Sequence, residues 1–223
     1  IEEGSFVVFD LETTGLSRYR DRITEIGACK VIDGKICEIY NELVNPEMLI
    51  PEKITEITGI TNQMVESCPK IEEVLPGFLE FCQGSILVGQ NTDFDVGFVR
   101  ENCTRLGLDF NPLYLDTLPM ARALFADMKK FSLDKIARKL EIPAFNHHRA
   151  SDDARATAQI FIKMFKMIMK EDGIDLSSIN KLKSHWPKAK HEYFSATVFA
   201  KNKIGLKNLY KLISESRMKY FND

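Results

Sequence analysis

The chain has 223 residues, with 30 Lys and Arg side chains against 32 Asp and Glu, so its formal net charge at pH 7 is −2. Its 44% hydrophobic and 28% charged residues are typical of a globular protein and exclude a disordered or fibrous one. No apolar run approaches the roughly 18–20 residues that a membrane helix needs, so we expect no membrane association. Five cysteines without a C-x-x-C pair favour a reduced, cytoplasmic chain.

The charge is distributed unevenly along the chain. Residues 1–162 contain 17 basic and 26 acidic side chains, a net charge of −9, whereas residues 163–223 contain 13 basic and 6 acidic ones, a net charge of +7. An asymmetry of this size predicts two parts with different roles.

The first third of the chain reads as strands. Residues 6–9 (FVVF) predict a buried strand that continues to about Glu12, and residues 23–31 predict a second one. Asp33-Gly34 is a two-residue turn signal that leads into a third strand over about 36–44, which indicates a hairpin. A short helix with a loop is expected within 50–61.

Helices and strands then alternate. Apolar residues at helical spacing predict a helix over 71–82, which Gly84 ends, and further helices beginning near Phe94, ending near Phe125, following Ser132 as N-cap, and covering 149–169. Short strands are expected at 85–89 and 114–116. The resulting class is α/β, with a mixed sheet of about five strands flanked by helices.

A composition shift near Asp172-Gly173 divides the chain into an expected domain over 1–172 and a small basic appendage over 173–223. Within the appendage we expect a strand over 192–201 and a short amphipathic helix over 206–213. A piece this small is too short to build a generous core alone, so we interpret it as part of something larger.

Two carboxylates form the first candidate site. Asp10 and Glu12 are two residues apart at the end of a predicted strand, so their side chains point to the same face. Adjacent carboxylates repel each other unless cations neutralise them, and hard divalent ions prefer such oxygen ligands. A solvated strand end is the alternative reading of this pair taken alone.

Three motifs give the pair a context. Residues 9–16 (FDLETTGL), 89–95 (GQNTDFD) and 148–153 (HRASDD) resemble, in order and spacing, the three exonuclease motifs of the DEDDh family, the relatives of the proofreading subunit of bacterial DNA polymerase III. The resemblance covers about residues 5–170. It implies an RNase H-like fold.

The resemblance also assigns the catalytic residues. Asp10, Glu12, Asp95 and Asp153 would hold two divalent metal ions, Mg²⁺ or Mn²⁺, which such phosphodiester hydrolysis needs at the attacking and leaving oxygens. His148 would act as the general base toward the nucleophilic water.

Substrate contacts follow from the same resemblance. Thr13 and Thr14 would hold the 3′-terminal nucleotide and Leu16 would wedge against its base, whereas Phe94 either packs under the sugar or fills the core. Thr58 and Asn91 complete the expected contacts. Thr58 and Gln90 depart from the family, in which His is common at both positions.

Two other acidic residues have expected structural roles. Asp93 is interpreted as the N-cap of the helix that follows it, rather than as a metal ligand. Glu25 lies in a family-like strand, residues 23–27 (ITEIG), and we expect it to be structural.

The basic segment over 192–221 resembles the chain that follows the exonuclease insertion in PolC-type DNA polymerases III, where it re-enters a PHP domain. Its lysines either form a solvated face or contact phosphates. The predicted function is a metal-dependent 3′→5′ exonuclease that acts on single-stranded or frayed DNA 3′ ends, releases nucleoside 5′-monophosphates and proofreads within a larger replicative polymerase. An exoribonuclease of the same fold and a non-catalytic tethering module are the alternatives.

Overall fold

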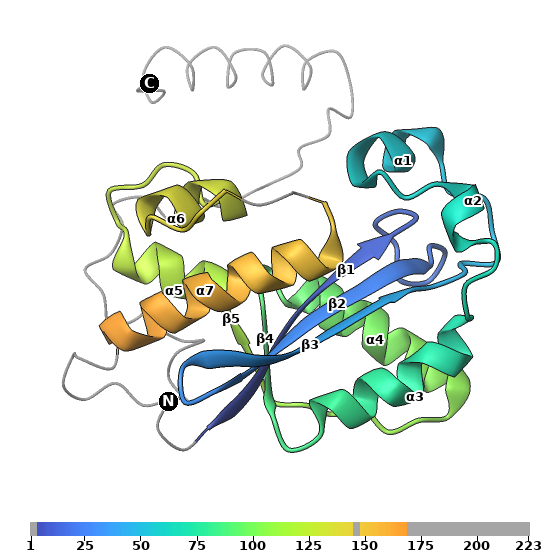
Figure 1. Ribbon diagram of the computed structural model, residues 1–223, viewed down its shortest axis with the longest axis horizontal. Coiled ribbons are helices and arrows are strands. Elements are labelled where there is room, and N and C mark those ends of the chain that lie inside the picture. The colour runs from blue at the N-terminus through green and yellow to red at the C-terminus, as the bar shows by residue number, and fades with distance from the viewer. Residues whose placement is uncertain (1–3, 145–147, 169–223) are drawn as a thin grey trace, which may run out of the picture. The chain divides into compact units, whose positions relative to one another are not determined.

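A computed structural model describes residues 4–144 and 148–168. Its centre is a five-stranded sheet in the order β3-β2-β1-β4-β5 (Figure 1). Strand β1 pairs antiparallel with β2 and parallel with β4, so the sheet is mixed, as the sequence predicted. The strands are β1 (Ser5–Thr13), β2 (Ile23–Ile32), β3 (Lys35–Leu43), β4 (Ile86–Gly89) and β5 (Tyr114–Asp116).

The predicted hairpin joins β2 to β3. Asp33 and Gly34 have φ angles of 51° and 68°, the left-handed pair that a tight two-residue hairpin turn requires. The turn therefore fixes the register in which β3 forms the edge of the sheet.

The helices match the predicted pattern with one addition. A four-residue helix, α2, follows α1 and was not expected; the side chain of its N-cap Thr61 accepts a hydrogen bond from the Met64 amide. The helices are α1 (Glu52–Thr58), α2 (Asn62–Val65), α3 (Ile71–Cys82), α4 (Asp93–Leu106), α5 (Thr117–Leu124), α6 (Leu133–Lys139) and α7 (Ala150–Ile168).

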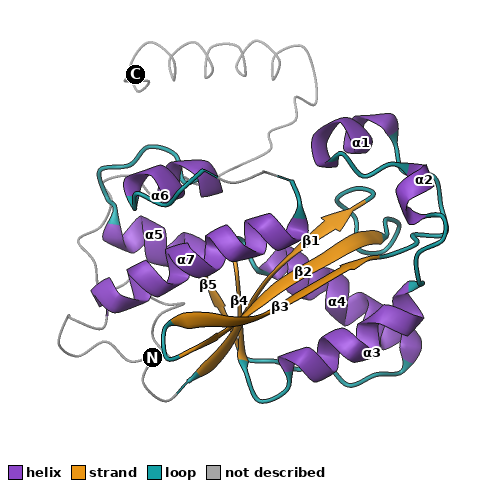
Figure 2. Ribbon diagram, in the orientation of Figure 1, coloured by secondary structure: helices purple, strands orange, loops and turns teal. Residues whose placement is uncertain are grey.

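Helices cover both faces of the sheet (Figure 2). Phe6 and Val8 of β1 belong to the core formed with α5, α6 and α7, whereas Val7 and Phe9 belong to the core formed with α3 and α4. Because side chains alternate along a strand, the even-numbered residues beyond Val8 continue on the α7 face. This alternation directs the carboxylates at the end of β1 toward α7.

The expected appendage over 173–223, with its strand at 192–201 and helix at 206–213, lies outside the described residues. Among the helices in the described part of the chain, none is long and apolar enough to cross a membrane.

Candidate active site

Three predicted site residues come together at the end of β1. Glu12, His148 and Asp153 each offer a ligand atom, and these atoms all lie within 4.8 Å of one another. Glu12 is half-buried at the end of β1, Asp153 is buried in the first turn of α7, and His148 is exposed just before that helix. The fold therefore brings Glu12 of β1 next to two residues at the start of α7 that are more than a hundred positions further along the chain.

The first turn of α7 fixes the position of Asp153. The His148 amide donates a 2.8 Å hydrogen bond to Asp153 Oδ2, and the amide of Asp153 donates to the Arg149 carbonyl oxygen at 2.9 Å. His148 itself has a φ of 63°, so the chain turns through the left-handed region as it enters the helix. This turn holds the imidazole and the carboxylate on the same side of α7.

Asp95 approaches β1 from α4. It lies in the first turn of that helix, is 4% exposed, and accepts a 3.2 Å hydrogen bond from the Leu11 amide, between the two carboxylates of β1. The group of atoms within 4.8 Å does not include Asp10 or Asp95. Both belong to the same electrostatic cluster, because Asp95 raises the pKa of Asp10.

The cluster disfavours its own ionisation. Burial raises the pKa of Asp10 well above its usual range, and Asp95, Asp153 and Glu12 raise it further. Burial, together with Asp153 and Glu25, raises the pKa of Glu12 to about 8. Burial also raises the pKa of Asp95 well above its usual range. Added positive charge would favour the ionised form of carboxylates held this close.

The donor set fits a hard divalent cation. Carboxylate oxygens are the ligands that Mg²⁺ and Mn²⁺ prefer, and the cluster combines several of them with one imidazole. The half-buried Glu12 and the exposed His148 leave one side of the cluster accessible from solvent.

The end of β1 and the loop that follows it contain the next predicted residues, of which Thr13 and Thr14 are buried. Thr14 is held against Arg22 by two hydrogen bonds: its amide donates to the Arg22 carbonyl oxygen at 2.8 Å, and its Oγ1 accepts from the Arg22 amide at 2.9 Å. Thr13 Oγ1 donates to the Gly15 carbonyl oxygen at 2.7 Å. Leu16 is 87% exposed. The loop is thus closed by internal hydrogen bonds, and Leu16 extends from it into solvent.

The other expected substrate contacts are placed differently. Phe94 is partly buried and packs on Phe98 with ring centroids 4.9 Å apart, which favours the core-filling alternative. Thr58 is buried, and its hydroxyl donates to the Ile54 carbonyl oxygen. Asn91 is exposed with a φ of 61°, and its backbone N–H donates a 3.0 Å hydrogen bond to the Asp116 carboxylate.

Gln90 stands where His is common in the family, and its side chain forms hydrogen bonds within the chain. Its Nε2 donates to the Phe131 carbonyl oxygen at 3.1 Å, and its Oε1 accepts a hydrogen bond from Thr117 Oγ1. The amide thereby joins the loop after β4 to the start of α5 and to the segment before α6.

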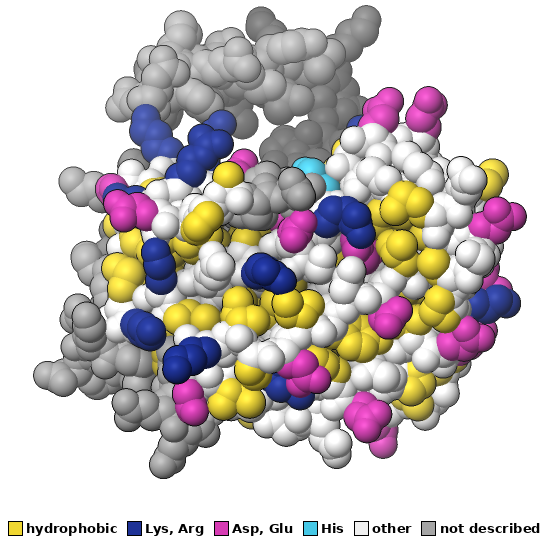
Figure 3. All heavy atoms as spheres, in the orientation of Figure 1, with side chains coloured by type: hydrophobic (Ala, Val, Ile, Leu, Met, Phe, Trp, Pro, Cys, Tyr) yellow, Lys and Arg dark blue, Asp and Glu magenta, His cyan; other side chains and the backbone are white. Residues whose placement is uncertain are grey.

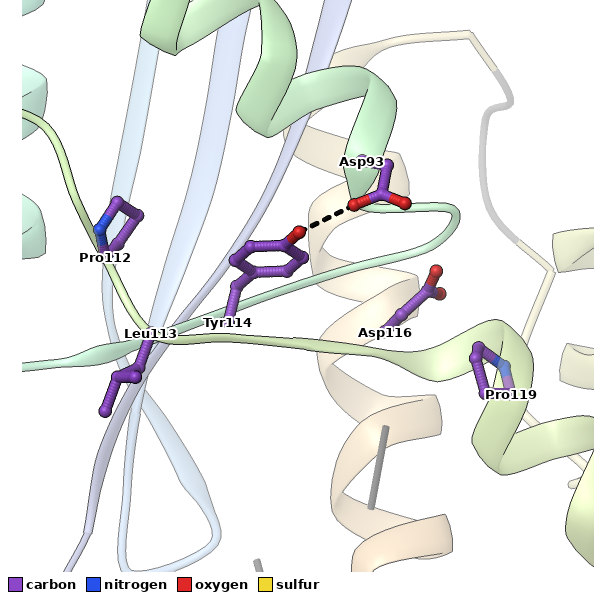
Figure 4. Close-up of a pocket in the computed structure, with 6 residues that line it drawn as sticks. All are labelled: Asp93, Pro112, Leu113, Tyr114, Asp116 and Pro119. Carbon is purple, nitrogen blue, oxygen red and sulfur yellow. Dashed lines mark hydrogen bonds between the residues drawn. The ribbon is translucent and has the colours of Figure 1, made fainter. Parts of the chain in front are cut away.

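The expectation that Asp93 caps α4 was wrong. Thr92 occupies the N-cap position, and Asp93 is the first residue of the helix. The Asp93 carboxylate instead accepts a 2.7 Å hydrogen bond from Tyr114 Oη (Figure 4). The two residues line an open hollow of about 430 Å³ with Asp116, and none of the carboxylates of the cluster is among its lining residues.

Sequence reasoning missed the partner of Glu25. The Glu25 side chain is fully buried and binds Arg149, the residue between His148 and α7. The sequence signal was present in the arginine of the third motif, but nothing in the sequence joined it to a strand more than a hundred residues earlier.

The fold and this cluster define a nuclease-like α/β enzyme, and comparison with known families makes the class specific. The model of the exonuclease family RNase_T matches residues 7–161, so the chain belongs to that family. Membership confirms the predicted resemblance to exonucleases and the assignment of the chain to an enzyme of that class.

The chain is also similar to curated DNA polymerases III of the PolC type. The chain is 43% identical over 222 residues to DNA polymerase III PolC-type of Caldanaerobacter subterraneus subsp. tengcongensis, and 46% identical over 221 residues to that of Thermotoga petrophila. Each alignment covers 99% of this chain and 16% of the relative. The chain therefore spans about one sixth of the length of these relatives.

Solved structures share the fold. Exonuclease X in complex with 5′ overhanging duplex DNA aligns with a TM-score of 0.62 and 29% identity, covering 79% of this chain and 98% of that one. The nuclease domain of 3′hExo, a DEDDh family member bound to rAMP, aligns with a TM-score of 0.64 and 17% identity, covering 74% and 93%. The RNase H-like mixed sheet with flanking helices is thus confirmed.

Proposed function

We propose that this chain is a metal-dependent 3′→5′ exonuclease that hydrolyses DNA 3′ ends and proofreads as part of a PolC-type DNA polymerase III. The observation that carries the proposal is the group formed by Glu12, His148 and Asp153, with Asp10 and Asp95 beside it. The similarity to PolC-type polymerases over nearly the whole chain supports the polymerase context.

Asp10, Glu12, Asp95 and Asp153 are the residues that would hold the cations. Two divalent ions, Mg²⁺ or Mn²⁺, would supply the positive charge that stabilises the attacking and leaving oxygens of the scissile phosphate. The carboxylates would neutralise and orient these ions, and the raised pKa values of Asp10 and Glu12 indicate that ion binding would compete with protons there.

His148 provides the base. Its imidazole is exposed beside Glu12 and Asp153, so a ring nitrogen can take the proton of a water aimed at the phosphorus atom. The bond between the Asp153 carboxylate and the His148 amide holds the base in register with the cluster.

The loop after β1 would bind the terminal nucleotide. Thr13 ends β1 directly beyond Glu12, and Thr14 begins a loop that hydrogen bonds to Arg22 and Gly15 close; Leu16 is exposed for contact with a base. The exposed Leu16 favours frayed or single-stranded ends, because an unpaired terminal base can pack against its side chain.

The proposal is tested by the polarity and cofactor dependence of cleavage. A primer labelled at its 3′ end with a terminal mismatch should release labelled nucleoside 5′-monophosphate with Mg²⁺ or Mn²⁺, and remain intact in EDTA. A 5′-labelled copy should shorten stepwise. Faster cleavage of a matched RNA 3′ end would instead favour an exoribonuclease, and intact ends under all conditions would indicate a non-catalytic tethering module.

A further inference from the structure

Glu25 is a fully buried carboxylate just outside the cluster. It lies on β2 directly opposite Glu12 of β1. Its two oxygens accept hydrogen bonds from Arg149 Nη2 at 2.8 Å and Arg149 Nε at 3.2 Å, and from the Ala150 amide at 3.0 Å. One carboxylate on the sheet thus binds both the side chain and the backbone at the start of α7.

This arrangement is electrostatically demanding. A buried carboxylate is costly unless it is paired and hydrogen-bonded, and Glu25 faces a second carboxylate, Glu12. An apolar side chain would fill the same position in β2 without that cost. The charge of Glu25 is therefore best explained by what it binds, the guanidinium of Arg149.

Arg149 connects the pair to the catalytic segment. It directly follows His148, and its carbonyl oxygen accepts the amides of Asp152 and Asp153 in the first turn of α7. The His148 amide in turn donates to Asp153. Residues 148–153 thus form one hydrogen-bonded unit, and Glu25 attaches this unit to the sheet.

Gly27 provides a second attachment two residues along β2. A Cβ atom at Gly27 would lie 2.1 Å from the Ala150 carbonyl carbon and 2.2 Å from the Ser151 amide nitrogen. The backbone of α7 therefore rests directly on β2 at the position that pairs with Asp10. Both contacts set the height and direction at which the helix begins.

We propose that Glu25 and Arg149 act as positioning residues, an ion pair that docks the first turn of α7 on β2 and so places His148 and Asp153 relative to Asp10 and Glu12. The inference rests on the proposed exonuclease function. Neither residue touches the reacting atoms; each acts through the geometry of His148 and Asp153.

The experiment uses Arg149→Ala on the full chain. Because residues that orient catalytic ligands typically contribute roughly 10–100-fold, kcat for mononucleotide release should fall by about that factor, with KM within about threefold of wild type. The Arg149 side chain is 37% exposed, so added methylguanidinium can reach the vacated position and should restore part of kcat in a saturable way. Arg100→Ala, at an exposed position of α4, is the matched control. Its kcat should equal that of wild type and should not change when methylguanidinium is added.

A second readout does not depend on activity. In Glu25→Gln, the amide oxygen can still accept the Ala150 N–H but the charge that holds Arg149 is lost, so hydrogen exchange of the Ala150–Asp153 amides should accelerate while amides of β1 keep wild-type rates. An unchanged kcat in Arg149→Ala, a loss that methylguanidinium does not reverse, or unchanged exchange in Glu25→Gln would overturn the positioning role. If the wild-type chain showed no Mg²⁺-dependent 3′ cleavage, the proposed function would be contradicted instead. The hydrogen-exchange measurement does not require activity, so it tests the docking of α7 separately.

Discussion

At the scale of single residues, the cluster combines carboxylates whose burial favours protonation with an exposed imidazole. Asp10, Glu12 and Asp95 are held close together at the end of β1, and burial and mutual repulsion raise the pKa of each. His148 stands at the open side of the group. The imidazole therefore leads to a prediction about catalysis, and the carboxylates lead to a prediction about the pH dependence of stability.

His148 is expected to act as the general base. His148→Ala should lower kcat by roughly 10²–10⁴-fold, because general-base catalysis contributes on that order. His147→Ala is the matched control, since His147 lies outside the three-motif pattern, and it should keep a near-wild-type rate. Single-turnover cleavage of a 3′-labelled primer measures both. A near-normal rate in His148→Ala would remove His148 from that role.

Glu12 predicts how the stability of the metal-free chain depends on pH. Its pKa is about 8 in the folded chain against an ordinary value near 4.5, so the folded state binds the proton more tightly than the unfolded state does. The stability from this group is complete below about pH 4.5 and is lost as pH rises through about 8. Asp10 and Asp95 act in the same direction.

The measurement is the melting temperature in EDTA between pH 5 and pH 9. It should fall across this range, and Mg²⁺ should restore more of it at the alkaline end, where the ligands are ionised. Glu12→Gln should flatten the EDTA curve, since the glutamine has no proton to lose. A melting temperature in EDTA that rises from pH 6 to pH 9 would contradict this account.

At the scale of elements, the alternation of β1 positions the site. Phe6 and Val8 bury the α7 face of the sheet, and the same alternation then places Asp10 and Glu12 beneath the start of α7. The close approach of α7 to β2 at Gly27 sets the distance between these carboxylates and the start of α7.

Gly27→Ala should disrupt this contact. The new methyl group would overlap the Ala150 and Ser151 backbone, which cannot rotate away, so we expect a loss of roughly 1–3 kcal/mol or more in the free energy of unfolding. Gly77→Ala in α3 is the control, because its nearest neighbour would be Tyr40 Oη at 3.7 Å. That change should stabilise the chain by roughly 0.5–1 kcal/mol, since glycine weakens a helix interior.

Denaturant unfolding of both variants measures these changes. If Gly27→Ala were as stable as wild type, the close approach of α7 to β2 would be contradicted. If Gly77→Ala were destabilising, the helical environment assigned to α3 would be wrong.

Much of the element pattern could be predicted from local signals. Helix α3 (Ile71–Cys82) has the bounds that helical spacing indicated, because that pattern repeats within a few residues, and the strand expected at 114–116 is β5. Helix α2 was missed, since four residues offer too little periodicity, and its Thr61 cap is visible only once the helix is known.

The candidate site shows the limit of local reasoning. The three motifs named Asp10, Glu12, Asp95, His148 and Asp153, and the structure brings Glu12, His148 and Asp153 within one group. The ion pair of Glu25 with Arg149 and the bond of Asp93 to Tyr114 join distant segments, so they depend on how the helices pack. Capping chemistry alone made Asp93 look like an N-cap, although the preceding threonine occupies that position.

At the scale of the whole molecule, the net charge of −2 conceals an acidic part, residues 1–162, and a shorter basic part, residues 163–223. In the described part, acidic and basic side chains both occupy the visible face, with basic ones gathered on the side of α6 and α7 (Figure 3). The acidic excess of residues 1–162 includes the carboxylate cluster, whose charge divalent cations would offset. A negative total is therefore compatible with a nucleic-acid substrate.

The most direct test of the central claim is cleavage of a 3′-labelled, mispaired DNA primer by the Asp10→Ala, Glu12→Ala double variant in Mg²⁺ and in Mn²⁺. Asp93→Asn serves as the matched control, because Asp93 binds Tyr114 rather than the cluster. The control should release labelled nucleoside 5′-monophosphate as wild type does, while the double variant should release none above the EDTA background. Release by the double variant at a rate near wild type would contradict the carboxylate-based metal mechanism.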